Sequence, residues 1–388
     1  MNGNATVASR VAGYALVFAA ALTPLMAWLG PLGFAPLLGL VGLACLPLVR
    51  IRSEDAAVGV VLLLLVAWAA LSSLWSPEKP HKLDDSVALK LGLQLVLYWS
   101  AWQGARQAEP GLRRRALQVF AWGLAGYGVL LLVEAFTGAG VYQLLRNAIH
   151  DPIRPDLGRK NIAQGSFVLA LLWPVAAAGG WRAGAPWWLA VPMALGSAVL
   201  SQIFLSDAPV LAVGVVVAAG GLVWIWPHSA PKAMALGAAV FILLMPVGLL
   251  ALIQSGANLN LPLSWSERVG YWTYAVQRIA EHPLRGWGLD ASRTFGPNIG
   301  LHPHNGAIQV WLELGVLGAC LAALIWAIAL RRLARETRSL VTAAAAGSAA
   351  VYLFFGSVSF GVWQEWWLAL AAMVCVIAAL GHAEEQAA

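Results

Sequence analysis

The hydrophobic and polar positions of the chain form long, unbroken apolar runs that are separated by short polar connections. Runs such as 58–74, 117–133, 210–226 and 233–253 approach or exceed the roughly 20 residues that cross a bilayer as a helix. They are continuously apolar and do not alternate with polar residues, so they predict helices and not the strands of a barrel. The pattern therefore indicates an all-α, polytopic integral membrane bundle.

Run length predicts about twelve spans in a single transmembrane domain over residues 1–388. The expected spans are 11–29, 31–49, 56–75, 86–103, 116–136, 161–180, 186–205, 208–227, 233–253, 306–330, 340–360 and 363–381. The first one follows Arg10 as a signal peptide would, but its length and the spans behind it favour a retained helix. Between the ninth and tenth spans, residues 254–305 form a long polar segment, which we expect to be a large helical loop.

Composition excludes an ordinary soluble domain, because 60% of the residues are hydrophobic, 11% are charged and the mean hydropathy is +0.73. Cys45, Cys320 and Cys375 all lie inside apolar runs, which argues against a disulfide framework and a thiolate metal site. The net charge is +6, but spans interrupt the basic residues and no nucleic-acid motif occurs. We therefore expect membrane lipids, and no nucleic acid, among the partners.

Basic residues in the short connections predict the orientation of the chain. These connections all fall on one side of the expected topology, and the positive-inside rule makes that side cytoplasmic. They carry Arg50, Arg52, Arg106, Arg113, Arg114, Arg115, Arg331, Arg332, Arg335 and Arg338. Both termini are then cytoplasmic, and the loops 76–85, 137–160 and 254–303 face the periplasm or exterior.

The outer loops are also basic, which topology does not explain. They contain Lys79, Lys82, Arg146, Arg154, Arg159, Lys160, Arg268, Arg278, Arg285 and Arg293. Arginine binds phosphate and carboxylate oxygens through a planar fork and stays charged at physiological pH, so this group favours an anionic ligand. Lipid headgroups or ion pairs with nearby Asp and Glu residues would explain a single arginine equally well.

The long outer segment contains the signals of an amphipathic helix. Ser264-Trp265-Ser266-Glu267 predicts a capping box at its start, and His282-Pro283 predicts its end. Arg268 and Arg278 lie on its polar side, and the glycine-punctuated turn after it would let Arg285 approach a ligand. A surface helix with solvated arginines is the alternative interpretation.

The segment from His304 to Gly318 joins a titratable residue directly to an apolar span, and such a residue is a site hypothesis by default. Asn305, Gln309 and Glu313 recur every four residues and form one polar stripe, which should face a cavity or other helices. Glu313 lies about 180° around the helix from His304, so it is poorly placed to orient that ring. Interhelical hydrogen bonds are as good an explanation for Gln309 and Glu313 as chemistry. Gly315 and Gly318 most simply permit close helix packing.

This segment fits a spaced pattern of a histidine, an amide or hydroxyl residue, nine residues, a glycine, two residues and a glycine. In that pattern it resembles the bacterial O-antigen ligases and the related O-antigen polymerases. The turn at Pro283-Leu284-Arg285-Gly286-Trp287-Gly288 is similar to a Pro-Gly-Gly turn that precedes the histidine in that family. Arg159-Lys160-Asn161 resembles the family's basic site on the outer face, with Arg154 and Arg159 as alternatives for one position. The resemblance is detailed over about residues 265–318 and elsewhere is architectural, implying a GT-C-like arrangement.

The resemblance implies transfer of O-antigen from undecaprenyl diphosphate to a sugar hydroxyl of the lipid A-core oligosaccharide, at the periplasmic face of the inner membrane. A histidine is suited to deprotonate the acceptor, so His304 is the expected general base. Arginines can bind the diphosphate and stabilise the charge that develops on it. We expect Arg268 and Arg285 to act catalytically, and Arg159, Arg154, Lys160 and Asn305 to bind substrate. No cofactor or metal is expected, and direct displacement would invert the anomeric configuration.

Three other functions remain open on the sequence. An O-antigen polymerase or a protein-directed oligosaccharyltransferase would use the same donor and differ only in the acceptor. A transporter or lipid flippase would also have many spans and buried polar groups. A transporter should show internal repeats or broken helices at equivalent positions in two halves, and neither is evident in the sequence.

Overall fold

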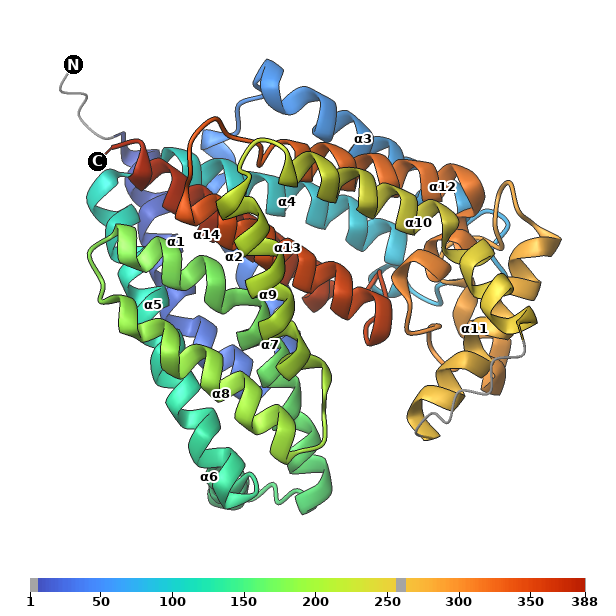
Figure 1. Cartoon of the computed structure of the whole chain (residues 1–388), viewed down its shortest axis with the longest axis horizontal. Helices are drawn as coiled ribbons and strands as arrows, with labels where there is room; N and C mark the ends of the chain where they lie inside the picture. Colours follow the sequence, from blue (N-terminus) through green and yellow to red (C-terminus); the bar gives the residue numbers. More distant parts are fainter. Residues whose placement is uncertain (1–5, 256–262, 388) are drawn as a thin grey trace.

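A computed structural model of the chain describes residues 6–255 and 263–387, and within that part the regular structure is entirely helical (Figure 1). The helices are α1 (Val7–Leu29), α2 (Phe34–Cys45), α3 (Ser53–Ser72), α4 (Val87–Gln107), α5 (Pro110–Thr137), α6 (Gly140–Ala148), α7 (Pro155–Arg182), α8 (Ala190–Ile203), α9 (Ala208–Ile225), α10 (Ala230–Gln254), α11 (Leu263–Glu281), α12 (Gly306–Arg331), α13 (Leu340–Val358) and α14 (Glu365–Glu385). Short 3-10 turns lie at Pro31–Gly33, Leu46–Leu48, Leu83–Asp85, Trp187–Leu189 and Ala291–Asn298. The all-α polytopic fold is confirmed.

Each of the twelve predicted spans coincides with a helix. Ten helical segments in the described part of the chain are long and apolar enough to cross a membrane. The other two are α4, which carries Lys90, Gln94 and Gln103 within its length, and α8, which with its preceding turn is a shorter apolar segment. The predicted outer segment, 254–305, contains α11 as expected, although its residues 256–262 lie outside the described residues.

The centre of the bundle is α7, the most deeply buried of the ten spans. It packs against α5, α8, α13 and α14, and the main apolar core also takes residues from α1, α2 and α4. A smaller apolar cluster joins α10, α11 and α12, and includes Leu249, Trp272, Ile279 and Leu312. The amphipathic helix α11 is therefore packed on the outer ends of α10 and α12.

The arginine-bearing connections gather at one end of the bundle, where the start of α1 and the end of α14 also lie (Figure 1). Asp55 is buried at the start of α3. It forms ion pairs with Arg106 of α4 at 2.6 Å and with Arg332 at the end of α12 at 3.3 Å. Arg113 of α5 pairs with Glu384 of α14 at 3.4 Å. The expectation that these connections share a side is thus consistent with the structure, and their cytoplasmic position remains a prediction of the positive-inside rule.

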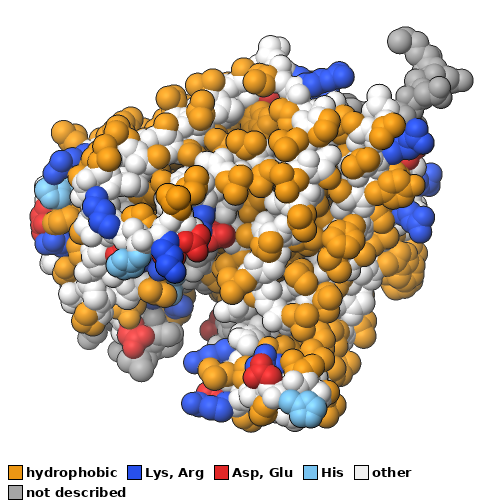
Figure 2. Space-filling view, turned by 180° about the vertical axis from the view of Figure 1, so that it is seen from behind, with side chains coloured by type: hydrophobic (Ala, Val, Ile, Leu, Met, Phe, Trp, Pro, Cys, Tyr) orange, Lys and Arg blue, Asp and Glu red, His pale blue; other side chains and the backbone are white. Residues whose placement is uncertain are grey.

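Two arms project from the opposite end of the bundle. One arm consists of the end of α5, α6 and the start of α7, and the other consists of α11 and the loop after it (Figure 1). The space-filling view shows a deep cleft between them, with Lys and Arg side chains on both rims (Figure 2). In the ribbon view, the turn between α13 and α14 lies between the bases of the two arms (Figure 1).

Helix α12 is broken at Gly315, whose φ of 64° and ψ of −163° are not helical. Only glycine adopts such angles readily, because a Cβ atom would clash with the backbone. The turn at residues 283–288 approaches the break so closely that a Cβ atom on Gly315 would overlap the carbonyl of Leu284. Gly315 therefore interrupts the helix and lets the turn at residues 283–288 pack against the break. The expectation that Gly315 serves close packing between helices was wrong.

The polar backbone groups released by the break are paired with the turn and with α3. The carbonyls of Leu312 and Glu313 accept from the N–H groups of Trp287 (2.9 Å) and Gly288 (2.8 Å), and Val316 N–H donates to the Pro283 carbonyl at 2.9 Å. The indole of Trp68 in α3 donates to the carbonyl of Leu314 at 2.9 Å. Unpaired backbone groups are costly away from water, so these bonds make the break tolerable at membrane depth.

Replacing Gly315 with alanine should destabilise the protein by about 2–4 kcal/mol, since the side chain adds backbone strain and a clash with the docked turn. The measurement is the thermal unfolding midpoint of the purified protein in detergent. Gly237→Ala is the matched control, because a Cβ atom at Gly237 in α10 meets nothing within 4 Å. Equal midpoints for the two variants would contradict the role of the break.

Candidate active site

His304 lies immediately before α12 and beside the turn that connects α13 with α14. Its ring Nδ1 is 2.8 Å from the backbone carbonyl oxygen of Ser359. A carbonyl oxygen can only accept, so Nδ1 carries the proton in the neutral ring and the lone pair is on Nε2. This tautomer leaves Nε2 able to accept a proton from another molecule.

Helix α11 covers this histidine from the side of the outer loop. The ring of Tyr271 is nearly parallel to that of His304, with centroids 6.2 Å apart. The buried indole of Trp272 donates to the carbonyl of Pro303 at 2.8 Å, which ties α11 to the residue just before His304. The helix begins at Leu263, one residue earlier than the predicted cap at Ser264, whose side chain lies outside the described residues.

Arg268 of α11 acts electrostatically on His304. Burial is the main cause that lowers the pKa of His304 below its ordinary value, the Ser359 carbonyl opposes this, and the positive charge of Arg268 lowers the pKa further. Arg268 itself is half-buried with its guanidinium 5.3 Å from the ring centre of Trp265, and burial lowers its pKa. The predicted base and one predicted arginine are thus close enough to interact.

His302 is a second histidine of the site that sequence reasoning missed. Its ring centroid lies 4.3 Å from that of His304, and its Nδ1 accepts a hydrogen bond from the backbone N–H of His304 at 3.2 Å. Its position two residues before the motif histidine was a usable signal. Tyr271 could also have been found, because it lies one helical turn after Arg268, whereas the carbonyl of Ser359 has no signature in the sequence.

The polar stripe of α12 is occupied by internal hydrogen bonds. Asn305 caps the helix by accepting from the N–H of Ile308 at 3.0 Å, and its amide Nδ2 is buried without a protein partner. Gln309 donates to Glu313 at 3.0 Å and accepts from the N–H of Val362 at 2.9 Å. The sequence allowed interhelical hydrogen bonds for Gln309; its bonds instead lie within α12 and to the α13–α14 turn, which the stripe faces.

Glu313 is completely buried and accepts four hydrogen bonds. One oxygen accepts from Ser292 Oγ (2.6 Å) and Gln309 Nε2 (3.0 Å), and the other from Asp290 N–H (2.7 Å) and Trp363 Nε1 (2.6 Å). These donors belong to the outer loop, α12 and the α13–α14 turn. The carboxylate therefore joins the three segments that surround the histidines, and it is not bonded to His304, as its position on the helix predicted.

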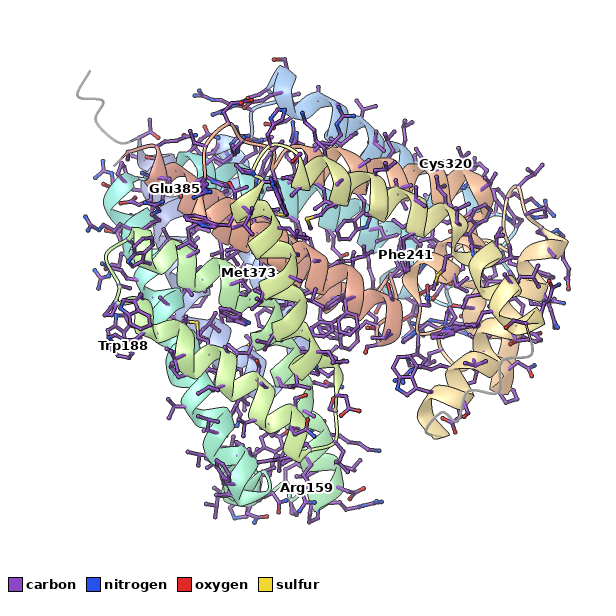
Figure 3. The ribbon with its side chains drawn as sticks, viewed as in Figure 1. Arg159, Trp188, Phe241, Cys320, Met373 and Glu385 are labelled. Carbon is purple, nitrogen blue, oxygen red and sulfur yellow. The ribbon has the colours of Figure 1, made fainter. Side chains whose placement is uncertain are left out.

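The remaining predicted residues lie farther from His304. Arg285 is exposed, with its guanidinium 5.8 Å from the ring centre of Trp75, on the turn that docks at the α12 break. Arg159 lies at the tip of the opposite arm (Figure 3), where its guanidinium is close to Gly138. Lys160 beside it is exposed, and Arg154 is paired with Asp156 through two bonds of 3.1 and 2.8 Å. The structure thus brings Arg268 and Asn305 to His304 and leaves the others on the rims or flank.

The local arrangement combines a neutral imidazole, a nearby guanidinium and an open cleft with basic rims. Within residues 6–255 and 263–387, no group of three or more His, Cys, Asp or Glu residues is arranged to hold a metal ion. A proton acceptor next to a fixed positive charge suits the deprotonation of a hydroxyl that attacks a substrate with an anionic leaving group.

Glu313→Gln should destabilise the protein by about 2–5 kcal/mol, because the amide would point two hydrogens at buried donors that the carboxylate now satisfies. Glu336→Gln is the control, since that carboxylate is exposed and forms an ion pair with His228. The two variants can be compared by thermal unfolding and by protease cleavage of the outer loop. A Glu313 variant as stable and as protease-resistant as the control would show that the four bonds do not hold the loop.

Comparisons with known proteins support the resemblance at a general level. No family model matches the chain. A protein of Rickettsia conorii named "Putative polysaccharide ligase" is 26% identical over an aligned length of 128, and the match covers 29% of this chain and 31% of that protein. Proteins of the same name from Rickettsia felis and Rickettsia prowazekii are 27% identical over 128 residues and 29% identical over 119 residues.

The matched segments span 31% of the length of the Rickettsia felis protein and 29% of the Rickettsia prowazekii protein, so the chain matches less than a third of these curated relatives. The chain is thus similar, over part of its length, to proteins named as polysaccharide ligases, in agreement with the resemblance that the His304 segment predicts.

Proposed function

We propose that the protein is an O-antigen ligase that transfers a glycan from undecaprenyl diphosphate to a sugar hydroxyl of lipid A-core. The observation that carries the proposal is the state of His304, whose Nδ1 is held by the Ser359 carbonyl and whose Nε2 is left as a proton acceptor. The polysaccharide-ligase names of the partial relatives support the same reaction class. The cleft would open on the periplasmic side of the bacterial inner membrane.

In the proposed reaction, the acceptor oxygen attacks the anomeric carbon that is linked to the diphosphate. Nε2 of His304 takes the hydroxyl proton as the new carbon–oxygen bond forms. The bond between the anomeric carbon and the phosphate oxygen breaks, and its electron pair leaves with undecaprenyl diphosphate. A single displacement of this kind inverts the anomeric configuration.

Basic residues would bind the diphosphate and stabilise the charge that develops on it. Arg268 is the first candidate because its charge already acts on His304. Arg159, Arg154 and Lys160 would contact the donor from the opposite rim of the cleft, and Asn305 offers its unpartnered buried amide. Arg285 was expected to act with Arg268, but its turn docks eight to twelve residues along the chain from His304, about 12–18 Å by the helical rise, so its catalytic role stays a prediction.

His304→Ala should lower the rate of transfer by about 10²- to 10⁴-fold, the usual contribution of a general base, with folded yield unchanged. The assay uses purified protein, glycan on undecaprenyl diphosphate and lipid A-core, with EDTA present to test the expected metal independence. His81→Ala is the matched control, because this histidine is exposed in another outer loop.

The outcomes of this assay separate the candidate functions. Transfer by wild type and His81→Ala, but not by folded His304→Ala, would support the ligase and its base. If folded wild type joins only two carrier-linked glycans, the protein is a polymerase, and if it glycosylates only a protein acceptor, it is an oligosaccharyltransferase. Movement of the donor across the membrane without any bond formation would indicate a transporter.

The rate of transfer should fall at acidic pH with a midpoint below 6.5, since burial and Arg268 lower the pKa of His304 and the neutral ring is the active base. Removing the charge in Arg268→Gln should raise that pKa and move the acid limb of kcat/KM to higher pH. Arg146→Gln is the control, because Arg146 pairs with Asp151 in the opposite arm. If the acid limb of kcat/KM has the same midpoint in wild type, Arg268→Gln and Arg146→Gln, then either His304 is not the titrating group or Arg268 does not act on it.

A further inference from the structure

The backbone at His304 is in the left-handed region, with a φ of 55°. For a residue that is not glycine, this conformation costs about 1–2 kcal/mol and persists only where surrounding contacts enforce it. Pro303 precedes it, and Asn305 after it is extended, with a φ of −147°. A specific interaction must therefore hold this single residue between the loop and α12.

The imidazole of His302 supplies that interaction. Its Nδ1 accepts from the backbone N–H of His304, so the side chain of one residue binds the main chain two residues later. Asparagine and aspartate side chains form the same closed turn with their Oδ1 atom, which occupies the same place as Nδ1 of histidine. The bond therefore fixes the direction in which the His304 side chain leaves the backbone.

The surroundings of His302 keep its ring in place and neutral. Because Nδ1 accepts, Nε2 carries the proton of the neutral ring. Nε2 lies 3.3 Å from the side-chain amide of Gln364, just before α14, and donates to the amide oxygen when that amide is turned over. Burial, together with the positive charge on His304 and Arg293, lowers the pKa of His302 to about 3. Nδ1 therefore remains an acceptor at neutral and mildly acidic pH. Because Nδ1 holds the His304 N–H and Nε2 carries the ring proton, His302 is not itself available as a base.

We infer that His302 is a positioning residue for the base, holding the backbone of His304 so that Nδ1 donates to the Ser359 carbonyl and Nε2 keeps the lone pair that accepts the proton. The inference rests on the proposed function of His304 as the base. Two anchors then act on one residue: His302 on its main chain and Ser359 on its ring. Loss of either one would let the ring turn without removing the catalytic group.

The test compares His302→Leu, which has no acceptor, with His302→Asn, which places Oδ1 where Nδ1 was. His302→Leu should lower kcat by about 10- to 100-fold with little change in KM for the donor, because small misplacements of a catalytic group have effects of this size. His302→Asn should restore kcat to within a few-fold of wild type. Folded yield and unfolding midpoint are measured for both variants. A purely structural role of His302 would lower stability without lowering kcat selectively over KM.

A second measurement does not depend on the reaction. The rate at which diethyl pyrocarbonate modifies His304, followed by mass spectrometry against pH, reports the pKa of that ring. In His302→Leu the released ring should lose its burial, and its midpoint should rise toward 6.5, whereas His302→Asn should keep the midpoint of wild type. Unchanged midpoints in both folded variants, together with equal kcat values, would overturn the inference.

These results also separate the inference from the proposed function. If wild type transfers no glycan but the His304 midpoint rises in His302→Leu and not in His302→Asn, His302 holds His304 and the ligase proposal fails alone. If wild type transfers glycan and both variants match it in kcat and in midpoint, the ligase proposal stands and the positioning role is wrong.

Discussion

The arrangement of the end of the bundle that carries the long 254–305 segment depends on the interruption of α12 at Gly315. A transmembrane helix normally satisfies its own backbone, and here four peptide groups turn instead to an outer loop and a neighbouring helix. Because these groups have no alternative partner in a membrane, the turn at residues 283–288 is held at one depth and in one register. The rest of the outer loop is then positioned by attachment to a rigid element.

Glu313, two residues before the break, extends this anchoring toward the site. Its four hydrogen bonds reach the loop at Asp290 and Ser292, the helix at Gln309 and the next turn at Trp363. The same α13–α14 turn provides the carbonyl of Ser359 that orients His304. Buried polar networks specify one arrangement strongly when every member is satisfied, which suits a site assembled from segments far apart in sequence.

The two halves of the cleft differ in how firmly they are built. The histidine side rests on α12, the α13–α14 turn and the packed helix α11, whereas the predicted basic residues of the opposite arm are exposed at its tip. This difference would suit the proposed reaction, in which the proton acceptor needs accurate geometry and a large donor must enter and leave.

The sequence by itself determined the class and much of the architecture of this protein. Continuous apolar runs allow only helices that satisfy their own backbone, so every predicted span coincides with a helix, and His282-Pro283 correctly ended α11. The His304 segment also identified the candidate base and Asn305 as its neighbour. These features depend on local hydropathy, helix-ending signals and short spacings, all of which are written in consecutive residues.

Only the tertiary structure decided what surrounds the candidate base. In the sequence, Gly315 was interpreted as a residue that permits helix packing. The sequence does not show that a turn about thirty residues upstream returns and hydrogen-bonds to the backbone around Gly315. The orientation of His304 depends on a backbone carbonyl at Ser359, which any residue type could provide. Arg285 was grouped with Arg268 on their common loop, and the docking of the turn separated them. Contacts between distant segments follow from packing in three dimensions, which spacing along one chain does not encode.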